Sequence, residues 1–256
     1  MNTTFTSDGS RRHATINVPD EAIGGVILCH GFFANGGAMT GLAQKLNTLG
    51  LATITFDFYA HGKSDGAFED MTVSRQVHDA EAATLALQEA LGSKSGRIPL
   101  GIFGSSLGGL TALACASRHQ DTLRCLGMRG PTLDFPDAWT RLTGITTPQW
   151  RQRGHVTLRN PFTMKDAHIP FFLYEDAMTF RAADLAKMIR IPTKIWQGGG
   201  DTICLPSLAE QFAKSNAETT LKLVAGADHN FSAKEDYDAL TNDVAEWFAT
   251  TLRGAR

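Results

Sequence analysis

Hydrophobic residues gather in short continuous runs along the chain, and most of these runs end at or beside a glycine. The runs cover residues 24–30, 51–58, 98–104, 122–128, 191–198 and 220–226. Runs of this length and composition are typical of strands that are covered on both faces, as in a parallel sheet. The pattern therefore predicts a central sheet of buried strands.

Helical spacing of apolar residues fills the stretches between several of these runs. Residues 72–92 show it best and stop at Gly92, while residues 38–50 stop at Gly50 and residues 236–252 are amphipathic. Strands that alternate with helices predict an α/β fold with a doubly wound, mostly parallel sheet. At the N-terminus, residues 3–19 predict a hairpin that turns at Asp8-Gly9 and forms an antiparallel edge.

The alternation is interrupted once, over residues 130–190, where the chain is irregular in pattern and rich in aromatic residues. A structureless loop of that length is improbable in a compact domain. We expect an inserted cap over one end of the sheet, because open α/β sheets bind ligands beyond the carboxyl ends of their strands. The core would then comprise residues 1–129 and 191–256. The alternative is a peripheral subdomain that does not contact substrate.

The strongest candidate for chemistry is Ser106, which lies in a G-x-S-x-G pattern at residues 104–108. An apolar run precedes the pattern and a helix-like stretch follows it. Such a sharp turn crowds the neighbouring backbone, so a β-carbon at Gly104 or Gly108 would clash. The strand–turn–helix context is typical of a strained turn that projects a nucleophilic serine.

A serine nucleophile needs a base, and the base needs an acid to orient it. His229 lies just past the last predicted strand, and Asp201 follows the strand before it in the stretch GGGD. Asp228 is adjacent to His229 in sequence, but neighbouring side chains diverge, so Asp201 is the better partner. The alternatives are a surface loop histidine and a turn or helix-cap aspartate.

Backbone N–H groups of Phe32 and Leu107 are the candidate oxyanion donors. The stretch HGF at residues 30–32 ends the first long strand, and Gly31 would let it turn toward the serine. The helix that begins at Leu107 would direct its free N–H groups to the same point. We expect His30 to orient this loop, unless it is only a satisfied core histidine.

These residues together resemble the α/β-hydrolase superfamily over nearly the whole chain. The resemblance rests on HGF at 30–32, D-x-x-x-H-G-x-S at 57–64, the serine turn, GGGDTICLP around Asp201 and GADHNF around His229. Within the superfamily the chain resembles the carboxylesterase branch near the cinnamoyl or feruloyl esterases and the monoacylglycerol lipases. The resemblance implies ester hydrolysis through an acyl-enzyme without a cofactor or a metal. Ser105 and Leu107 flank the serine, whereas cinnamoyl esterases have G-H-S-Q-G.

The substrate pocket is predicted with less detail than the reacting groups. We expect His30, Phe33, Trp139 and Trp150 to contact an apolar acyl or alcohol group. The alternative is that these rings only fill the core of the insertion.

Three functions are compatible with the site residues. An esterase with Ser106, Asp201 and His229 is the first, and an amide- or thioester-cleaving serine hydrolase is the second, because the same residues serve both. The third is a small-molecule-binding protein that has lost turnover, although all three reacting residues are present.

Composition narrows the partners and the compartment. A net charge of -2 offers no electrostatic attraction to nucleic acid. The four cysteines show no metal-type spacing, and no apolar stretch suits a signal peptide or a membrane span. We therefore expect a cytoplasmic protein that acts on a small-molecule ester, and a homodimer is compatible with the sequence.

Overall fold

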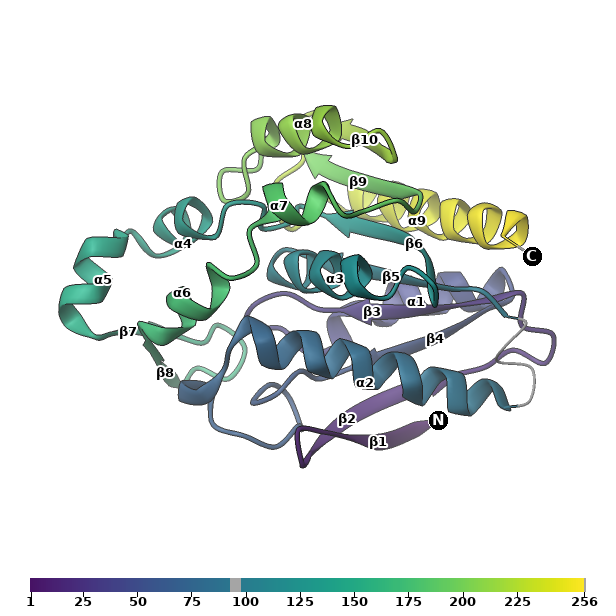
Figure 1. Ribbon diagram of the computed structural model, residues 1–256, viewed down its shortest axis with the longest axis horizontal. Helices are drawn as coiled ribbons and strands as arrows, with labels where there is room; N and C mark the ends of the chain where they lie inside the picture. The colour runs from purple at the N-terminus through teal and green to yellow at the C-terminus, as the bar shows by residue number, and fades with distance from the viewer. Residues whose placement is uncertain (93–97, 256) are drawn as a thin grey trace.

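A mixed eight-stranded sheet forms the centre of the molecule (Figure 1). The computed structural model describes residues 1–92 and 98–255. The strands run in the order β1-β2-β4-β3-β5-β6-β9-β10 and are parallel from β4 to β10. Their bounds are β1 (Asn2–Ser7), β2 (Ser10–Asn17), β3 (Gly24–Cys29), β4 (Leu51–Phe56), β5 (Leu100–Ser105), β6 (Leu123–Arg129), β9 (Thr193–Gly198) and β10 (Thr219–Val224).

The sheet confirms the predicted fold class and the N-terminal hairpin. Strands β1 and β2 are antiparallel, and Asp8 and Gly9 between them have φ values of 46° and 71°. Every residue of β3, β4 and β5 is buried, which explains their continuous apolar runs. The expectation of burial on both faces is wrong for β10, in which only Thr219 is buried, because this strand pairs only with β9 at the sheet edge.

Helices cover both faces of the sheet. Helices α1 (Thr40–Thr48) and α9 (Lys234–Gly254) pack on one face, and α2 (Val73–Leu91), α3 (Leu107–Arg118) and α8 (Pro206–Ser215) pack on the other (Figure 1). The helices predicted at 38–50, 72–92 and 236–252 are confirmed. Helix α8 was not predicted, although Pro206 at its first position is a recognisable start signal. In the described chain no helix is long and apolar enough to cross a membrane.

Residues between β6 and β9, whose sequence pattern is irregular, form short helices and strands rather than a structureless loop. The elements are α4 (Phe135–Thr143), α5 (Thr147–Arg153), β7 (His155–Arg159), β8 (Asp166–Pro170), α6 (Phe172–Ala177) and α7 (Ala182–Ala186). Helices α4 to α6 extend past one end of the sheet (Figure 1). Two short 3-10 helices, η1 (Gly36–Met39) and η2 (Phe68–Asp70), lie in the loops after β3 and β4.

Aromatic rings hold the inserted segment together. The rings of Trp139 and Trp150 stack with centroids 4.1 Å apart. Trp150 is fully buried, and its indole N–H donates to the carbonyl of Ile169 at 3.0 Å. Because each tryptophan buries a large apolar area, the segment has a small core of its own.

A buried ion pair ties β2 to α2. Arg12 Nε donates to Asp79 Oδ1 at 2.7 Å, and both side chains are fully buried. The other carboxylate oxygen of Asp79 accepts the Tyr59 N–H at 2.7 Å. Burial raises the pKa of Asp79, and the charge of Arg12 opposes this rise. Each buried charge compensates the other, so that β2 and α2 can both bury a charged side chain at their contact.

All four cysteines are buried and free, and they do not form disulfides. Cys29, Cys115 and Cys125 lie in the sheet core and its helices, while Cys204 lies beside Asp201. Burial raises the pKa of each thiol, to about 12 for Cys115 and for Cys204. The thiols are therefore protonated and act as small hydrophobic side chains.

We predict that Arg12→Met lowers the free energy of unfolding by about 3–5 kcal/mol, because it leaves the Asp79 carboxylate buried without its partner. Urea unfolding followed by circular dichroism would measure the change. Arg11→Met on the same strand is the matched control. Arg11 pairs with Asp65 at the surface with 55% of its side chain exposed, so its loss should cost under about 1 kcal/mol. Equal losses in the two variants would contradict the prediction.

Candidate active site

Ser106 lies at a strained turn between β5 and α3. Its backbone has φ 55° and ψ -122°, which is unusual for a residue with a side chain. A β-carbon on Gly104 would lie 2.0 Å from the Gly108 carbonyl oxygen, and one on Gly108 would lie 2.3 Å from the His30 carbonyl oxygen. Only glycine fits at these two positions, so the G-x-S-x-G pattern has a direct steric cause.

The strained turn is held by hydrogen bonds from the neighbouring strand and loop. The Ser106 N–H donates to the carbonyl of Arg129 at 3.0 Å, and the Ser106 carbonyl accepts the Thr132 N–H at 3.0 Å. These bonds come from β6 and from the chain that follows it. They offset part of the cost of the unfavourable backbone conformation.

Three side chains from separate loops form one hydrogen-bonded row. His229 Nε2 lies 3.0 Å from Ser106 Oγ, and His229 Nδ1 lies 2.7 Å from Asp201 Oδ2. Ser106 follows β5, Asp201 follows β9 and His229 follows β10. The structure therefore brings together the three residues predicted to react, at the carboxyl ends of their strands.

Asp201 is held as a carboxylate by several donors. Its Oδ1 accepts the backbone N–H groups of Ile203 at 2.9 Å and Cys204 at 2.8 Å, and its Oδ2 also accepts from Gln197 Nε2 at 3.1 Å. Burial alone would raise the pKa of Asp201, but the hydrogen bonds from His229 and from the backbone outweigh it, so the pKa lies below its ordinary value. Sequence reasoning missed Gln197, whose only signal is a polar residue within an apolar strand.

Asp228 does not contact the imidazole of His229. Its carboxylate accepts the backbone N–H of Ser232 at 2.8 Å instead. The glycines before Asp201 allow the loop after β9 to contact the loop after β10, since a β-carbon on Gly198 would lie 2.4 Å from the Ala227 carbonyl oxygen. The predicted close approach of the acid loop to the histidine loop is therefore present.

The backbone of residues 31 and 32 lies against the serine turn. A β-carbon on Gly31 would lie 3.3 Å from both Ser106 Cβ and the Ser105 carbonyl oxygen. Within residues 1–92 and 98–255, neither the Phe32 N–H nor the Leu107 N–H has a hydrogen-bond acceptor. Phe32 and Leu107 line one small hollow together with Ser106.

His30 lies in the interior and does not face the cavity. Its Nε2 accepts the Phe58 N–H at 3.1 Å, so Nδ1 carries the proton and donates to the Gly31 carbonyl at 2.8 Å. Burial lowers the pKa of His30 to about 3, and burial likewise lowers the pKa of its neighbour His61 to about 4. This position suits the expected role of orienting the loop, and it leaves His30 out of the substrate pocket.

The carboxylate of Asp57 holds the loop after β3 and the loop after β4 together. It accepts the Gly36 N–H at 2.7 Å and the Lys63 N–H at 2.8 Å. A β-carbon on Gly62 would lie 2.2 Å from this carboxylate. The glycine-rich stretch at 57–66 thus serves to brace two loops of the site.

A cavity of about 440 Å³ opens beside Ser106 and His229. The core contributes Phe33 and Arg129 to its lining, and the inserted segment contributes Leu142, Leu158 and Phe162. Trp139 lines a small adjoining hollow together with Phe32 and Ser106. Of the predicted substrate residues, Phe33 and Trp139 therefore lie beside the serine, whereas Trp150 lies in the interior of the insertion.

Sequence reasoning missed Arg129, Leu142 and Leu158, because loops from distant parts of the chain form this cavity. A charged residue at the end of the apolar run 122–128 was the only available signal for Arg129.

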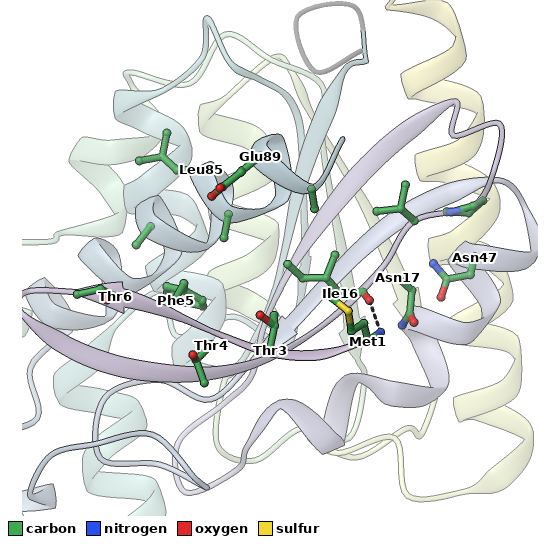
Figure 2. Close-up of a pocket in the computed structure, with 15 residues that line it drawn as sticks. Met1, Thr3, Thr4, Phe5, Thr6, Ile16, Asn17, Asn47, Leu85 and Glu89 are labelled. Carbon is green, nitrogen blue, oxygen red and sulfur yellow. Dashed lines mark hydrogen bonds between the residues drawn. The ribbon is translucent and has the colours of Figure 1, made fainter. Parts of the chain in front are cut away.

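A larger hollow of about 1130 Å³ lies elsewhere, between the β1–β2 hairpin and α2 (Figure 2). Phe5 and Ile16 from the hairpin lie across from Leu85 of α2, and the Met1 ammonium donates to the Ile16 carbonyl at 2.6 Å. Its lining includes none of the three residues in the hydrogen-bonded row. The larger hollow is therefore separate from Ser106, Asp201 and His229.

Asp201, Cys204 and His229 are also close enough to be considered as a metal site, with ligand atoms within 4.8 Å of one another. The Asp201 oxygens already accept four protein donors, one of them His229. The pKa of Cys204 is raised to about 12, whereas a thiol ligand must be deprotonated. The donor set fits the hydrogen-bonded row better than a metal.

Comparison with known proteins identifies the family. Residues 20–236 match the Hydrolase_4 family model, which is described as serine aminopeptidase, S33. The chain belongs to the Hydrolase_4 family. Family membership supports a hydrolase, and the fold is that of the α/β-hydrolases.

Several relatives of this Hydrolase_4 chain resemble it closely in fold despite low identity. Est1E from Butyrivibrio proteoclasticus, solved with ferulic acid bound, has a TM-score of 0.84 at 21% identity and covers 98% of this chain and 99% of its own. A soluble variant of monoglyceride lipase from Saccharomyces cerevisiae, in complex with a substrate analog, has a TM-score of 0.80 at 21% identity, with 97% and 94% covered. An uncharacterized 31.7 kDa protein of Escherichia coli, from the traX-finO intergenic region, is 23% identical, with 79% of this chain and 81% of that protein covered.

The two buried histidines predict a steep pH dependence of stability. Unfolding exposes His30 and His61, which then take up protons below about pH 6.5, while the folded protein resists protonation down to about pH 4. The free energy of unfolding should therefore fall as the pH drops through this window, by about 1.4 kcal/mol per pH unit for each proton. Urea titrations between pH 7 and pH 4 would measure the slope.

In His61→Asn the slope of the free energy of unfolding against pH should decrease by about one proton, because asparagine does not titrate. The asparagine amide can still donate to the Tyr59 carbonyl, which His61 Nδ1 contacts at 2.8 Å. His155→Asn, at an exposed position of β7, is the matched control and should leave the slope unchanged. A wild-type slope retained in His61→Asn would show that His61 does not titrate on unfolding.

Proposed function

We propose that this Hydrolase_4 protein is a serine hydrolase that cleaves a carboxylic ester through an acyl-enzyme. The observation that supports this proposal is the row from Ser106 Oγ through His229 to Asp201, with distances of 3.0 Å and 2.7 Å. The distances lie within hydrogen-bond reach of a nucleophile, its base and the group that orients the base. The conclusion rests on the site, because the fold alone is shared by many chemistries.

In the acylation step Ser106 Oγ attacks the ester carbonyl carbon, and His229 Nε2 takes the hydroxyl proton. Asp201 stays ionised, holds the tautomer with the proton on Nδ1 and stabilises the imidazolium. The carbonyl oxygen becomes an oxyanion that accepts hydrogen bonds from the Phe32 and Leu107 N–H groups. When the tetrahedral intermediate collapses, the C–O bond to the alcohol breaks and His229 returns the proton to the leaving oxygen.

Water completes the cycle by the same groups in reverse. His229 removes a proton from water, the resulting hydroxide attacks the acyl carbon, and Ser106 Oγ leaves with the proton from His229. The products are the free acid and the alcohol, and the enzyme returns to its starting state. No step requires a group beyond these side chains, the two backbone donors and water.

We also propose that residues 130–190 act as a cap over this site. Leu142, Leu158 and Phe162 of that segment line the same cavity as His229, and Phe162 is exposed. Together with Phe33 they form a mostly apolar pocket that suits an acyl or aryl group. The ferulic acid bound to Est1E and the substrate analog bound to the yeast monoglyceride lipase support a small carboxylic ester as the substrate class.

Amide cleavage is the second candidate, since the family description names a serine aminopeptidase. The two reactions share the nucleophile and the base but differ in the leaving group, because an amine must be protonated before it departs. A matched pair of an acyl p-nitrophenyl ester and the corresponding acyl p-nitroanilide would separate them. Faster turnover of the anilide would favour the peptidase.

For the triad we predict that Ser106→Ala and His229→Ala lower kcat for a p-nitrophenyl ester by at least roughly 10⁴-fold, and Asp201→Asn by roughly 10⁴-fold. Asp228→Asn is the matched control, because its carboxylate lies next to His229 in sequence but bonds only within its own loop. It should retain activity within about threefold of wild type. A fluorophosphonate probe should label Ser106 in wild type and nothing in Ser106→Ala. Full turnover by Ser106→Ala would contradict the proposal.

A further inference from the structure

Arg129 brings a positive charge into the cavity directly beside the nucleophile. It is the last residue of β6, and its partner in the register of β5 is Ser105. Its guanidinium donates to Ser105 Oγ from Nε at 2.9 Å and from Nη2 at 2.6 Å. The side chain also lines the cavity that contains Ser106 and His229. The charge is therefore one residue away from the reacting serine.

This guanidinium has no anionic partner among the described residues, because none of the ion pairs found within residues 1–92 and 98–255 includes Arg129. Burial lowers the pKa of Arg129, whereas Tyr237, Asp228 and Asp201 raise it through longer-range interactions. A guanidinium remains charged even so, and a partly buried charge without a partner is costly.

Arg129 has donors that no protein group of the described residues uses. In the part of the chain that the structure describes, no acceptor contacts Nη1, and Nη1 is not among the atoms sealed from solvent without a partner. Ser105 Oγ accepts from Nε and from one hydrogen of Nη2, on one edge of the guanidinium. The other edge, formed by Nη1 and the second hydrogen of Nη2, can bind the two oxygens of a carboxylate.

The other arginine of the cavity is already engaged. Arg159 of β7 lies 3.5 Å from Asp166 of β8, and 61% of its side chain is exposed. Its charge is therefore paired and screened by solvent. Arg129 is the charge in this cavity that a ligand would have to neutralise.

We propose that Arg129 binds a carboxylate carried by the substrate, so that the enzyme selects esters with a free carboxylate near the scissile bond. This inference rests on the proposed ester hydrolysis and specifies the substrate for it. One guanidinium balances one negative charge, which a carboxylate carries, whereas a phosphate monoester carries about −1.5 to −2. The rest of the pocket is largely apolar, so a mismatch in charge would be poorly solvated.

Pairs of esters that differ only in charge test the proposal. On the acyl side, the monoethyl esters of succinate, glutarate and adipate are each compared with the same ethyl ester in which the free carboxylate is replaced by a carboxamide. Release of ethanol is measured. On the alcohol side, O-acetylglycolate is compared with O-acetylglycolamide, and acetate release is measured. For at least one pair, wild type should prefer the carboxylate in kcat/KM by roughly 10- to 100-fold, as expected for a hydrogen-bonded charge pair. The pair that shows the preference tells which side of the ester carries the carboxylate.

In Arg129→Met the preference within that pair should fall to near one, and in Arg129→Lys it should be reduced but retained, since lysine keeps the charge without the planar fork. Arg124→Met is the matched control, because Arg124 is exposed on the same strand. It should keep the wild-type ratio. The ratio is measured within each variant, so a general loss of activity or of folded protein cancels.

Outcomes for this inference and for the proposed function are distinct. If wild type hydrolyses neither member of any pair and a fluorophosphonate does not label Ser106, the proposed esterase is wrong. If wild type hydrolyses both members at equal kcat/KM in every pair, the esterase stands and the role of Arg129 is overturned, even without a folded variant. A preference for 2-phosphoethyl acetate over all the carboxylates would equally overturn the carboxylate assignment.

Discussion

Two positions without a β-carbon, Gly104 and Gly108, govern the geometry of the turn at Ser106. They let the end of β5 and the start of α3 approach within distances that no other residue allows. Ser106 is held between them in a backbone conformation that costs about 1–3 kcal/mol. The distance from its hydroxyl to His229, and the approach of Gly31 from the β3 loop, both depend on this turn.

The parallel sheet explains why residues from distant parts of the sequence meet at the turn. Ser106 and His229 are 123 positions apart, yet both follow the carboxyl end of a parallel strand. Asp201 and Arg129 reach the same edge from β9 and β6. The inserted segment leaves from this edge after β6, and its residues Leu142, Leu158 and Phe162 line the same cavity as Ser106 and His229.

The sequence predicted the sheet, most of its helices and the residues of the hydrogen-bonded row, because each leaves a local signal. Continuous apolar runs mark the buried strands, and glycines mark the turns where backbones touch. Most of the cavity lining left no such signal, although Phe33 was expected there and does line the cavity. Trp150 was expected at the substrate but packs inside the insertion, while Arg129 and Leu158 line the cavity through tertiary contacts alone. His30 also lies in the interior, where its hydrogen bonds to the backbone shape the loop of Phe32. Pattern can place a strand, but which side chains face a shared space depends on how loops from different strands pack.

Because every cysteine is buried, the rate of thiol labelling reports how often the folded structure opens locally. Thiol reagents react with the thiolate, and here each sulfhydryl is both protonated and shielded by the core. Modification must then wait for a fluctuation that admits the reagent. Cys204 lies next to Asp201, whereas Cys125 packs under α9. Their separate labelling rates therefore distinguish opening of the loop that carries Asp201 from separation of α9 from the sheet.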